Sequence, residues 1–191
     1  MAGSSRYTAV LDANVLYPAL LRDVLLSLAH ADLYSAKWSA HIREEWMRSL
    51  LRDRPGMEAQ IAAAAQAMEE AIPDCLVCGY EHLIDGLKMP DPGDRHVMAA
   101  AIAGHADAIV TWNGKDFPQD LLDPFGIEIQ TPDEFVLNQL MLDKVTALAA
   151  LRRMRERWAR PQYDAPALVA LLERRGLAQT AAHLRDVVDL L

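Results

Sequence analysis

Short apolar runs alternate with longer segments of helical periodicity over the first 142 residues of the chain. The runs of strand length cover residues 7–12, 32–38, 75–80, 107–112 and 127–132. Apolar positions at helical spacing mark residues 17–31, 39–53, 55–73, 94–106 and 132–142. Because the short runs are almost continuously apolar, they indicate parallel strands buried on both faces. The pattern therefore predicts an α/β three-layer sandwich, with a central parallel sheet and helices on both faces.

The tail of the chain shows helical patterning without strand-like runs. Three amphipathic helices are expected there, at residues 143–159, 165–176 and 178–191. We therefore divide the chain into a body, residues 1–142, and a helical extension, residues 143–191. Helices this short cannot bury their apolar faces alone, so the extension must pack on the body or on a partner.

Composition narrows the class of protein. With 191 residues, 52% of them hydrophobic, the chain can fill a sizeable core. Its longest segment without a charged residue, 96–106, is far shorter than the roughly 20 apolar residues of a membrane-spanning helix. Cys75 and Cys78 are too few for a disulfide framework and fit buried side chains in a strand. With no signal-peptide pattern at the start, these features predict a cytoplasmic protein without membrane contact.

Charge is distributed unevenly between the two parts. Residues 1–142 contain 10 Lys and Arg against 21 Asp and Glu, whereas residues 143–191 contain 9 against 6. The acidic body argues against binding nucleic acid through bulk positive charge, although metal ions could reverse the local sign at a phosphate-binding site. The basic cluster Arg152–Arg160 is the best candidate for direct phosphate contact; the alternative is a solvated helix face.

Polar residues gather where the predicted strands end, which is where parallel sheets bind ligands. The candidates are Asp12 and Asn14 after the first strand, Asp94 at the start of a helix, and Thr111, Asn113 and Asp116 in the segment "TWNGKDF". Taken singly, each aspartate has a structural explanation as a helix cap or a turn residue. Together, several carboxylates at one edge would repel one another unless a cation such as Mg²⁺ or Mn²⁺ joined them.

The helix predicted at 39–53 supplies a further carboxylate. Neighbouring side chains on a helix point about 100° apart, so only one of Glu44 and Glu45 can face the site. Glu45 borders the apolar stripe of Ile42 and Trp46, whereas Glu44 lies four residues before Arg48 as in an exposed ion pair. We favour Glu45.

Four segments together resemble a known family. "VLDANVL", "IREEW", "PDPGDRHVMAAA" and "ADAIVTWNGKDF" are similar to PIN-domain ribonucleases, in particular the VapC-type toxins of bacterial toxin–antitoxin systems. The resemblance covers about residues 6–142 and implies a PIN-like sandwich. The extension lies outside the minimal PIN fold and resembles the helical addition of some VapC-type toxins. It could bind RNA, contact a cognate antitoxin or complete the core.

The resemblance also implies a site and its partners. The family's catalytic and metal-binding positions match Asp12, Glu45, Asp94 and Asp116, with Asn14, Thr111 and Asn113 in support and Asp91 as a substitute for Asp94 or an additional ligand. The implied reaction is hydrolysis of RNA with Mg²⁺ or Mn²⁺, leaving a 3′-hydroxyl and a 5′-phosphate. An RNA substrate, a cognate antitoxin and a homodimer are the implied partners. Candidate RNA contacts are Arg95, Lys115, Arg152, Arg153 and Arg155.

Two other classes compete with this hypothesis. A PIN fold without catalysis could act as a scaffold for RNA or protein, but a scaffold has no reason to keep mutually repelling carboxylates. A phosphatase of the haloacid-dehalogenase type also places an aspartate after its first strand. It normally has a second aspartate two residues later, where this chain has Asn14.

Overall fold

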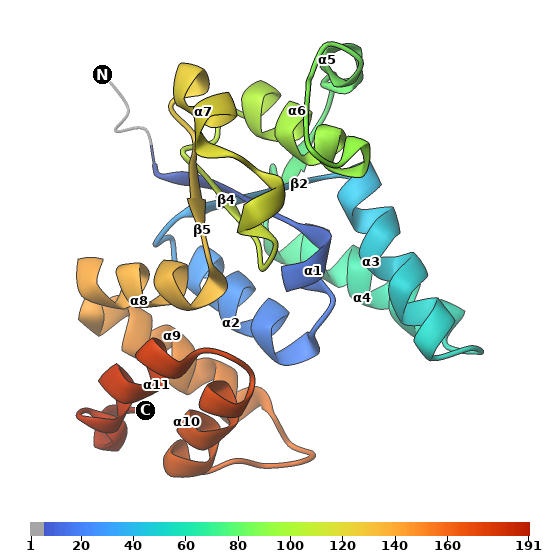
Figure 1. Ribbon diagram of the computed structural model, residues 1–191. Helices are drawn as coiled ribbons and strands as arrows, with labels where there is room; N and C mark the ends of the chain where they lie inside the picture. Colours follow the sequence, from blue (N-terminus) through green and yellow to red (C-terminus); the bar gives the residue numbers. More distant parts are fainter. Residues whose placement is uncertain (1–5) are drawn as a thin grey trace.

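The computed structural model describes residues 6–191, so the first five residues of the predicted body lie outside the described part. Its centre is a sheet of five parallel strands in the order β3-β2-β1-β4-β5 (Figure 1). The strands are β1 (Thr8–Leu11), β2 (Ser35–Ser39), β3 (Leu76–Val77), β4 (Ala108–Val110) and β5 (Glu128–Gln130). This arrangement confirms the predicted α/β fold with a parallel sheet.

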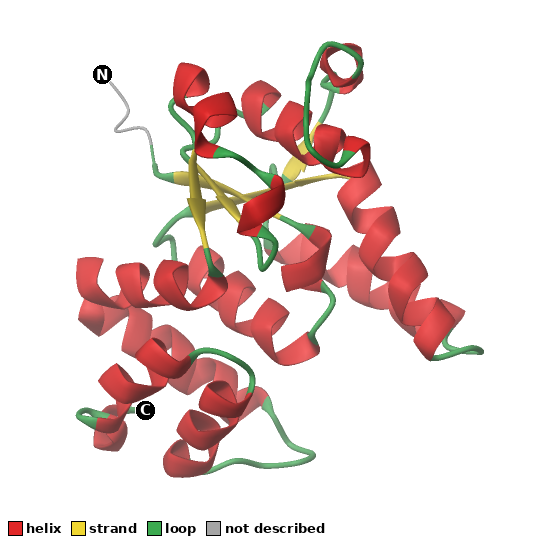
Figure 2. Ribbon diagram, viewed as in Figure 1, coloured by secondary structure: helices red, strands yellow, loops and turns green. Residues whose placement is uncertain are grey.

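Helices cover both faces of the sheet, with α6 and α7 on one side and α2 and α8 on the other (Figure 2). The body contains α1 (Ala13–Leu16), α2 (Ala19–His30), α3 (Ala40–Asp53), α4 (Glu58–Ala71), α5 (Glu81–Ile84), α6 (Arg95–Ala103), α7 (Gln119–Leu122) and α8 (Pro132–Leu142). The long helices occupy the predicted segments. Helices α1, α5 and α7 were not predicted, because a four-residue helix has too few positions to display a period.

The strands are shorter than their apolar runs, most clearly at residues 75–80. Only Leu76 and Val77 pair with β2, and the chain then turns at Gly79, whose φ is +74°. Cys75 is buried, but Cys78 is exposed. The prediction that both cysteines are buried in a strand was therefore wrong for Cys78, because the strand ends one residue before it.

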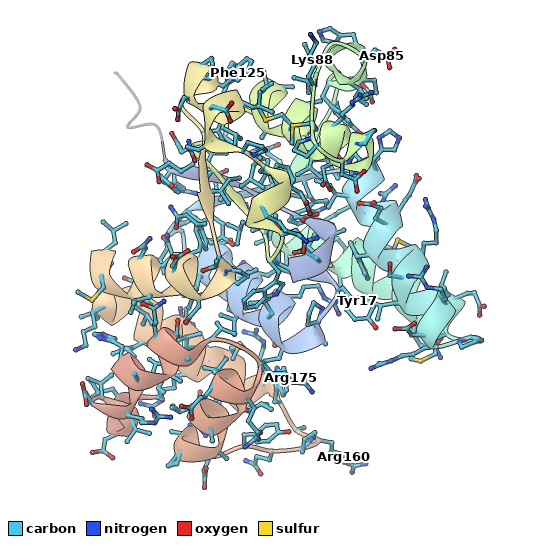
Figure 3. All side chains as sticks on the ribbon, viewed as in Figure 1. Tyr17, Asp85, Lys88, Phe125, Arg160 and Arg175 are labelled. Carbon is cyan, nitrogen blue, oxygen red and sulfur yellow. The ribbon has the colours of Figure 1, made fainter. Side chains whose placement is uncertain are left out.

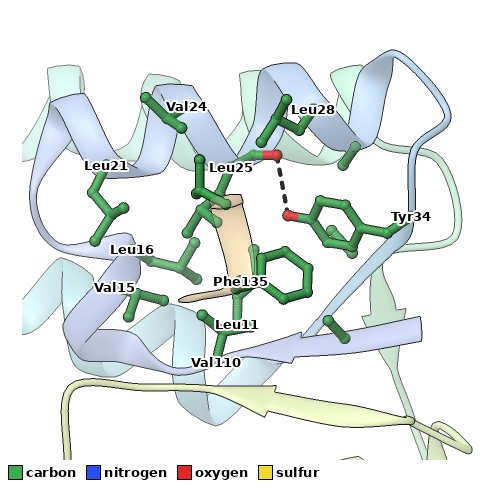
Figure 4. Packing of buried hydrophobic residues seen from close by; sticks show 14 of the residues in the cluster. Leu11, Val15, Leu16, Leu21, Val24, Leu25, Leu28, Tyr34, Val110 and Phe135 are labelled. Atoms are coloured by element: carbon green, nitrogen blue, oxygen red, sulfur yellow. Dashed lines mark hydrogen bonds between the residues drawn. The ribbon is translucent and has the colours of Figure 1, made fainter. Parts of the chain in front are cut away.

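The core between α2 and the sheet is closely packed around two aromatic rings (Figure 4). Tyr34 and Phe135 meet edge to face with ring centroids 4.7 Å apart, a favourable aromatic geometry. The Tyr34 hydroxyl donates a 3.0 Å hydrogen bond to the carbonyl of Leu25, so its buried polar atom is satisfied. This core fixes β1, and thereby the position of the residue that follows it.

The extension forms α9 (Lys144–Arg157), α10 (Ala165–Arg174) and α11 (Ala178–Arg185). Its buried side chains, among them Leu151 and Leu172, belong to the same hydrophobic cluster as the body. The carboxylate of Asp133 on α8 accepts hydrogen bonds of 2.8 and 2.9 Å from the N–H groups of Gln179 and Thr180 at the start of α11. The extension therefore helps to complete the core. None of the helices in residues 6–191 is long and apolar enough to cross a membrane.

Candidate active site at the carboxyl edge of the sheet

Asp12 is held where β1 ends. Leu11 of β1 pairs with Val110 of β4, so the residues that follow, Asp12 and Thr111, are neighbours at the same edge. Asp12 is only 5% exposed, and its N–H continues the ladder by donating to the carbonyl of Val110 at 3.2 Å. One carboxylate oxygen, Oδ1, accepts from the N–H of Ala13 at 2.6 Å, so Asp12 also caps α1, as its alternative explanation expected.

The second carboxylate oxygen of Asp12 is fixed by two polar side chains. Oδ2 accepts from Nδ2 of Asn14 at 2.6 Å and from the hydroxyl of Thr111 at 2.7 Å. Among the described residues, three hydrogen bonds thus occupy three of the roughly four lone-pair positions of the carboxylate, which leaves one on Oδ1. Burial raises the pKa of Asp12, while the bonds from Thr111 and Ala13 lower it and the charge of Glu45 raises it.

The same network ties the β4 turn to the site. The Trp112 N–H donates to Oδ1 of Asn14 at 3.1 Å, and the Asn113 N–H donates to the hydroxyl of Thr111 at 3.0 Å. Asn14 and Thr111 therefore orient both the carboxylate of Asp12 and the backbone that follows β4. Asn113 itself borders the pocket described below.

Helix α3 brings Glu45 to this edge. Ser39, the last residue of β2, caps the helix by accepting from the N–H of Ile42 at 3.2 Å. Glu45 then faces the pocket while Glu44 is exposed. Oε2 of Glu45 lies 3.3 Å from Nε2 of His96 on α6, a contact that gives this histidine a polar role rather than one in packing alone.

Asp94 shows the mutual influence of the carboxylates most clearly. Burial, followed by the charges of Asp12, Asp91, Asp116 and Glu45, raises its pKa from 3.8 to about 6. Its side chain makes no capping hydrogen bond with α6, so the capping explanation does not hold for it. The carboxylate of Asp91 instead accepts from the N–H of Gly93 at 2.7 Å and caps its own 3₁₀ turn, Pro92–Asp94.

The carboxylates border an open pocket of about 630 Å³. Its lining residues are Asp12, Ala13, Asn14, Tyr17, Glu45, Arg48, Ser49, Arg52, Asp53, Asp94 and Asn113. Asp91 and Asp116 lie outside this lining, although their charges act on Asp94. Within residues 6–191, no three His, Cys, Asp or Glu side chains stand close enough to hold one metal ion between them. The carboxylates therefore lie at one edge of the sheet, but they do not converge on a single metal position.

The predicted RNA contacts lie in different environments. Lys115 is exposed in the β4 turn, and Arg95 is half-buried, with a buried Nε that has no hydrogen-bond partner among the described residues. On α9, Arg152 is paired with Glu156 at 3.0 Å, and Arg155 donates to the carbonyls of Tyr163 and Leu191. Arg153 lines a separate groove beside α2 and α4. None of the five belongs to the lining of the acidic pocket.

Two lining residues, Arg48 and Arg52, did not emerge as candidates from the sequence. They follow Glu45 by three and seven residues on α3, and side chains at these spacings share one helical face. Their spacing from Glu45 is the sequence feature that could have identified them as pocket residues. The expected ion pair between Glu44 and Arg48 is not present among the described residues, where Arg48 faces the pocket instead.

An α/β protein with a cluster of carboxylates at the carboxyl edge of its parallel sheet fits the family that the sequence resembles. The family model described as "PIN domain" matches residues 8–115, and the model "VapC50 C-terminal domain" matches residues 132–186. The chain belongs to the PIN-domain family and is of the VapC type.

A curated relative supports this assignment. The protein named "Putative ribonuclease VapC50", from Mycobacterium tuberculosis, is 32% identical to this chain over 124 residues. The matched region covers 65% of this chain and 72% of the relative. No solved structure gives a significant match.

Proposed function

We propose that this protein is a metal-dependent endoribonuclease, with Asp12, Glu45, Asp94 and Asp116 as its catalytic and metal-binding residues. The observation that supports this most directly is that Asp12, Glu45 and Asp94 line one pocket at the carboxyl edge of the sheet. Burial, and after it the charges of four other carboxylates, raises the pKa of Asp94. Such mutual repulsion is costly in a fold and is relieved when a cation binds. The name of the curated relative, a ribonuclease, points to the same activity.

The donor set fits a hard divalent cation. Carboxylate oxygens suit Mg²⁺ and Mn²⁺, and Mg²⁺ usually keeps several waters while binding only one or two protein carboxylates. Asp12 has one unoccupied lone-pair position, and Asp94 has no hydrogen bond to its side chain among the described residues. A shared ion held partly through water is therefore compatible with carboxylates that do not converge on one point.

The roles of the residues follow from their contacts. Asn14 and Thr111 hold Oδ2 of Asp12, so the remaining position on Oδ1 keeps a fixed direction. His96 holds Glu45 at the wall of the pocket. When bound, Mg²⁺ or Mn²⁺ supplies positive charge for the phosphate oxygens and lowers the pKa of the attacking water. Hydrolysis would leave a 3′-hydroxyl and a 5′-phosphate, as in the family.

The biological setting is part of the same proposal. A VapC-type protein is expected to act in the cytoplasm as the toxin of a toxin–antitoxin pair, with a cognate antitoxin as its partner and a homodimer as its assembly. The phosphatase alternative loses support, because Asn14 is used to hold Asp12 and Thr111 and the chain belongs to the PIN family. The scaffold remains the second candidate, since the described carboxylates do not form a closed metal cage.

RNA cleavage tests the proposal. Purified protein should cut a pool of single-stranded RNA with Mn²⁺ present, and EDTA should stop the reaction. Asp116→Asn should abolish cleavage, whereas Asp120→Asn, an exposed aspartate on α7, should leave it unchanged. Binding of RNA without metal-dependent cleavage by the wild type would instead establish the scaffold.

A further inference from the structure

We propose that Arg48 and Arg52 on α3 bind the RNA phosphates next to the one that is cut, so that the strand runs along this helix into the acidic pocket. The inference rests on the proposed nuclease function and adds to it a path for the substrate. It differs from the expectation that the arginines of α9 contact RNA.

The first argument for this inference is the position of Arg48 and Arg52 relative to Glu45 on α3. Glu45, Arg48 and Arg52 line one continuous pocket, together with Ser49 between the two arginines. An α-helix rises about 1.5 Å per residue, so the backbone at Arg48 lies about 4.5 Å and that at Arg52 about 10.5 Å beyond Glu45. The two guanidinium groups thus stand at successive distances from the carboxylates, as contacts to successive phosphates require.

The second argument is that Arg48 and Arg52 have no ion-pair partner among the described residues. Seven of the thirteen other arginines in residues 6–191 have an ion-pair or hydrogen-bond partner, for example Arg43 with Glu69, Arg157 with Asp23 and Arg185 with Glu173. Neither Arg48 nor Arg52 forms an ion pair among residues 6–191, and Arg52 has only a 3.5 Å contact with the hydroxyl of Ser49. Arg48 and Arg52 are both exposed.

The acidic residue next to these arginines, Asp53, does not form an ion pair with either of them among the described residues. Asp53, which also lines the pocket, accepts a hydrogen bond from the hydroxyl of Tyr17 rather than pairing with Arg52. Tyr17 is itself one of the lining residues, and Figure 3 shows it between α2 and α3. The pocket therefore has a carboxylate end, suited to cations, and an arginine end, suited to anions. A phosphodiester chain with bound cations fits both ends, because guanidinium groups bind phosphate through two parallel hydrogen bonds.

Substrates of two lengths allow the role of the α3 arginines to be tested separately from the proposed nuclease function. A single-stranded RNA oligonucleotide reaches the α3 arginines, whereas bis(p-nitrophenyl) phosphate has one phosphodiester and no neighbouring phosphate. Cleavage of either substrate by the wild type with Mn²⁺ establishes the nuclease centre independently of the arginines. The contribution of α3 then appears only in the comparison of the two substrates.

The experiment compares Arg48→Gln/Arg52→Gln with the wild type and with Arg152→Gln/Arg153→Gln, a matched pair on α9. We expect kcat/KM for the oligonucleotide to fall about tenfold or more in the α3 variant, with the small substrate unaffected. The salt dependence should weaken by about 0.7 in log–log slope for each lost phosphate contact on single-stranded RNA. Binding of RNA in an Asp94→Asn background should weaken in parallel, which gives a readout independent of turnover.

Three results would overturn the inference while leaving the nuclease function intact. The α3 variant could retain the wild-type kcat/KM and salt slope for the oligonucleotide. The α9 variant could lose as much activity as the α3 variant, which would indicate bulk charge. The small substrate could be affected as strongly as the oligonucleotide, which would indicate damage to the pocket. If the wild type cleaves neither substrate, the proposed function itself fails.

Discussion

The acidic pocket and helix α9 are both highly charged, but their charges are partnered in opposite ways. The carboxylates of the pocket lie near one another, and the pKa of Asp94 is raised to about 6. On α9, Arg155 bonds to two backbone carbonyls, and Arg157 bonds to Asp23 and to the hydroxyl of Ser27. Among the described residues, no Lys or Arg forms an ion pair with the pocket carboxylates Asp12, Glu45 and Asp94, and none of the arginines of α9 lines the pocket. The contrast favours a functional role for the pocket carboxylates and a structural role for Arg155 and Arg157 of α9.

The largest expected effect is the loss of cleavage in Asp94→Asn. The substitution removes one negative charge where the proposed ion and phosphate meet, so turnover should fall at least about 100-fold. Because it also removes repulsion from four carboxylates, the free energy of unfolding should stay the same or rise. RNA cleavage assays and urea unfolding measure the two quantities. A protein that stays active, or that unfolds more easily, would contradict the comparison.

The contact between Trp112 and Gly176 should give the next largest effect. Gly176 has a φ of +92°, and a Cβ at this position would lie 2.9 Å from the ring of Trp112, which is 39% exposed in the turn after β4. Gly176→Ala should therefore cost the strain of positive φ plus that of overpacking, about 2–4 kcal/mol in all.

Gly126→Ala is the matched control, since Gly126 also has positive φ, +68°, but has open space around it. It should cost only about 1–2 kcal/mol. The difference between the two variants, measured by urea unfolding, isolates the contact between the extension and the active-site turn. Equal losses would show that Trp112 does not press on the extension.

Substitutions of the α9 arginines should lower the free energy of unfolding but leave RNA cleavage unchanged. Arg155→Met removes hydrogen bonds to the carbonyls of Tyr163 and Leu191 and should cost about 1–2 kcal/mol. Arg152→Met removes only an exposed ion pair with Glu156 and should cost at most about 0.5 kcal/mol. Turnover should be unchanged in both. A strong loss of cleavage in either would assign α9 to the site.

The smallest effect concerns pH in protein without metal. Asp94 in the folded state takes up a proton near pH 6, whereas the unfolded chain does so near 3.8, so between these values the folded state binds more protons. The contribution of this group to the free energy of unfolding therefore falls as pH rises from about 4 to 6. For a half-buried group we expect less than about 1 kcal/mol.

Asp94→Asn should be more stable than the wild type at pH 7 in EDTA, and the difference should shrink toward pH 4. Urea unfolding at several pH values measures it. Adding Mn²⁺ to the wild type should close the gap at pH 7, because bound cations offset the repulsion. A gap that is independent of pH would show that the charge of Asp94 is not destabilising.

The sequence predicted what depends on local pattern. The long helices and the strand ends at Asp12 and Thr111 follow from apolar periodicity and from the polar residue that closes each run. The short helices α1, α5 and α7 have no such period. The exposure of Cys78 depends on β3 ending after two residues, which is set by its pairing with β2.

Contacts between residues far apart in the sequence could not be predicted, because they depend on how distant segments pack. Arg157 forms a hydrogen bond with Asp23, 134 positions away in the sequence. The ring of Trp112 lies against Gly176 because α10 and α11 pack on the body. The spacing of Arg48 and Arg52 from Glu45 was visible, but it acquires meaning only once α3 is known to border the pocket.

Calorimetric titration of Mn²⁺ tests the central claim most directly. Wild type and Asp12→Asn are compared, both shown to be folded by their unfolding curves, with and without an oligonucleotide in which a methylene group replaces each 3′-bridging oxygen, so that the bond to be cut cannot be hydrolysed. Binding that is present in the wild type and lost or strongly weakened in the variant is the result we predict. A folded wild type that binds no Mn²⁺ in either condition, or a variant that binds it equally well, would contradict a metal site at the end of β1.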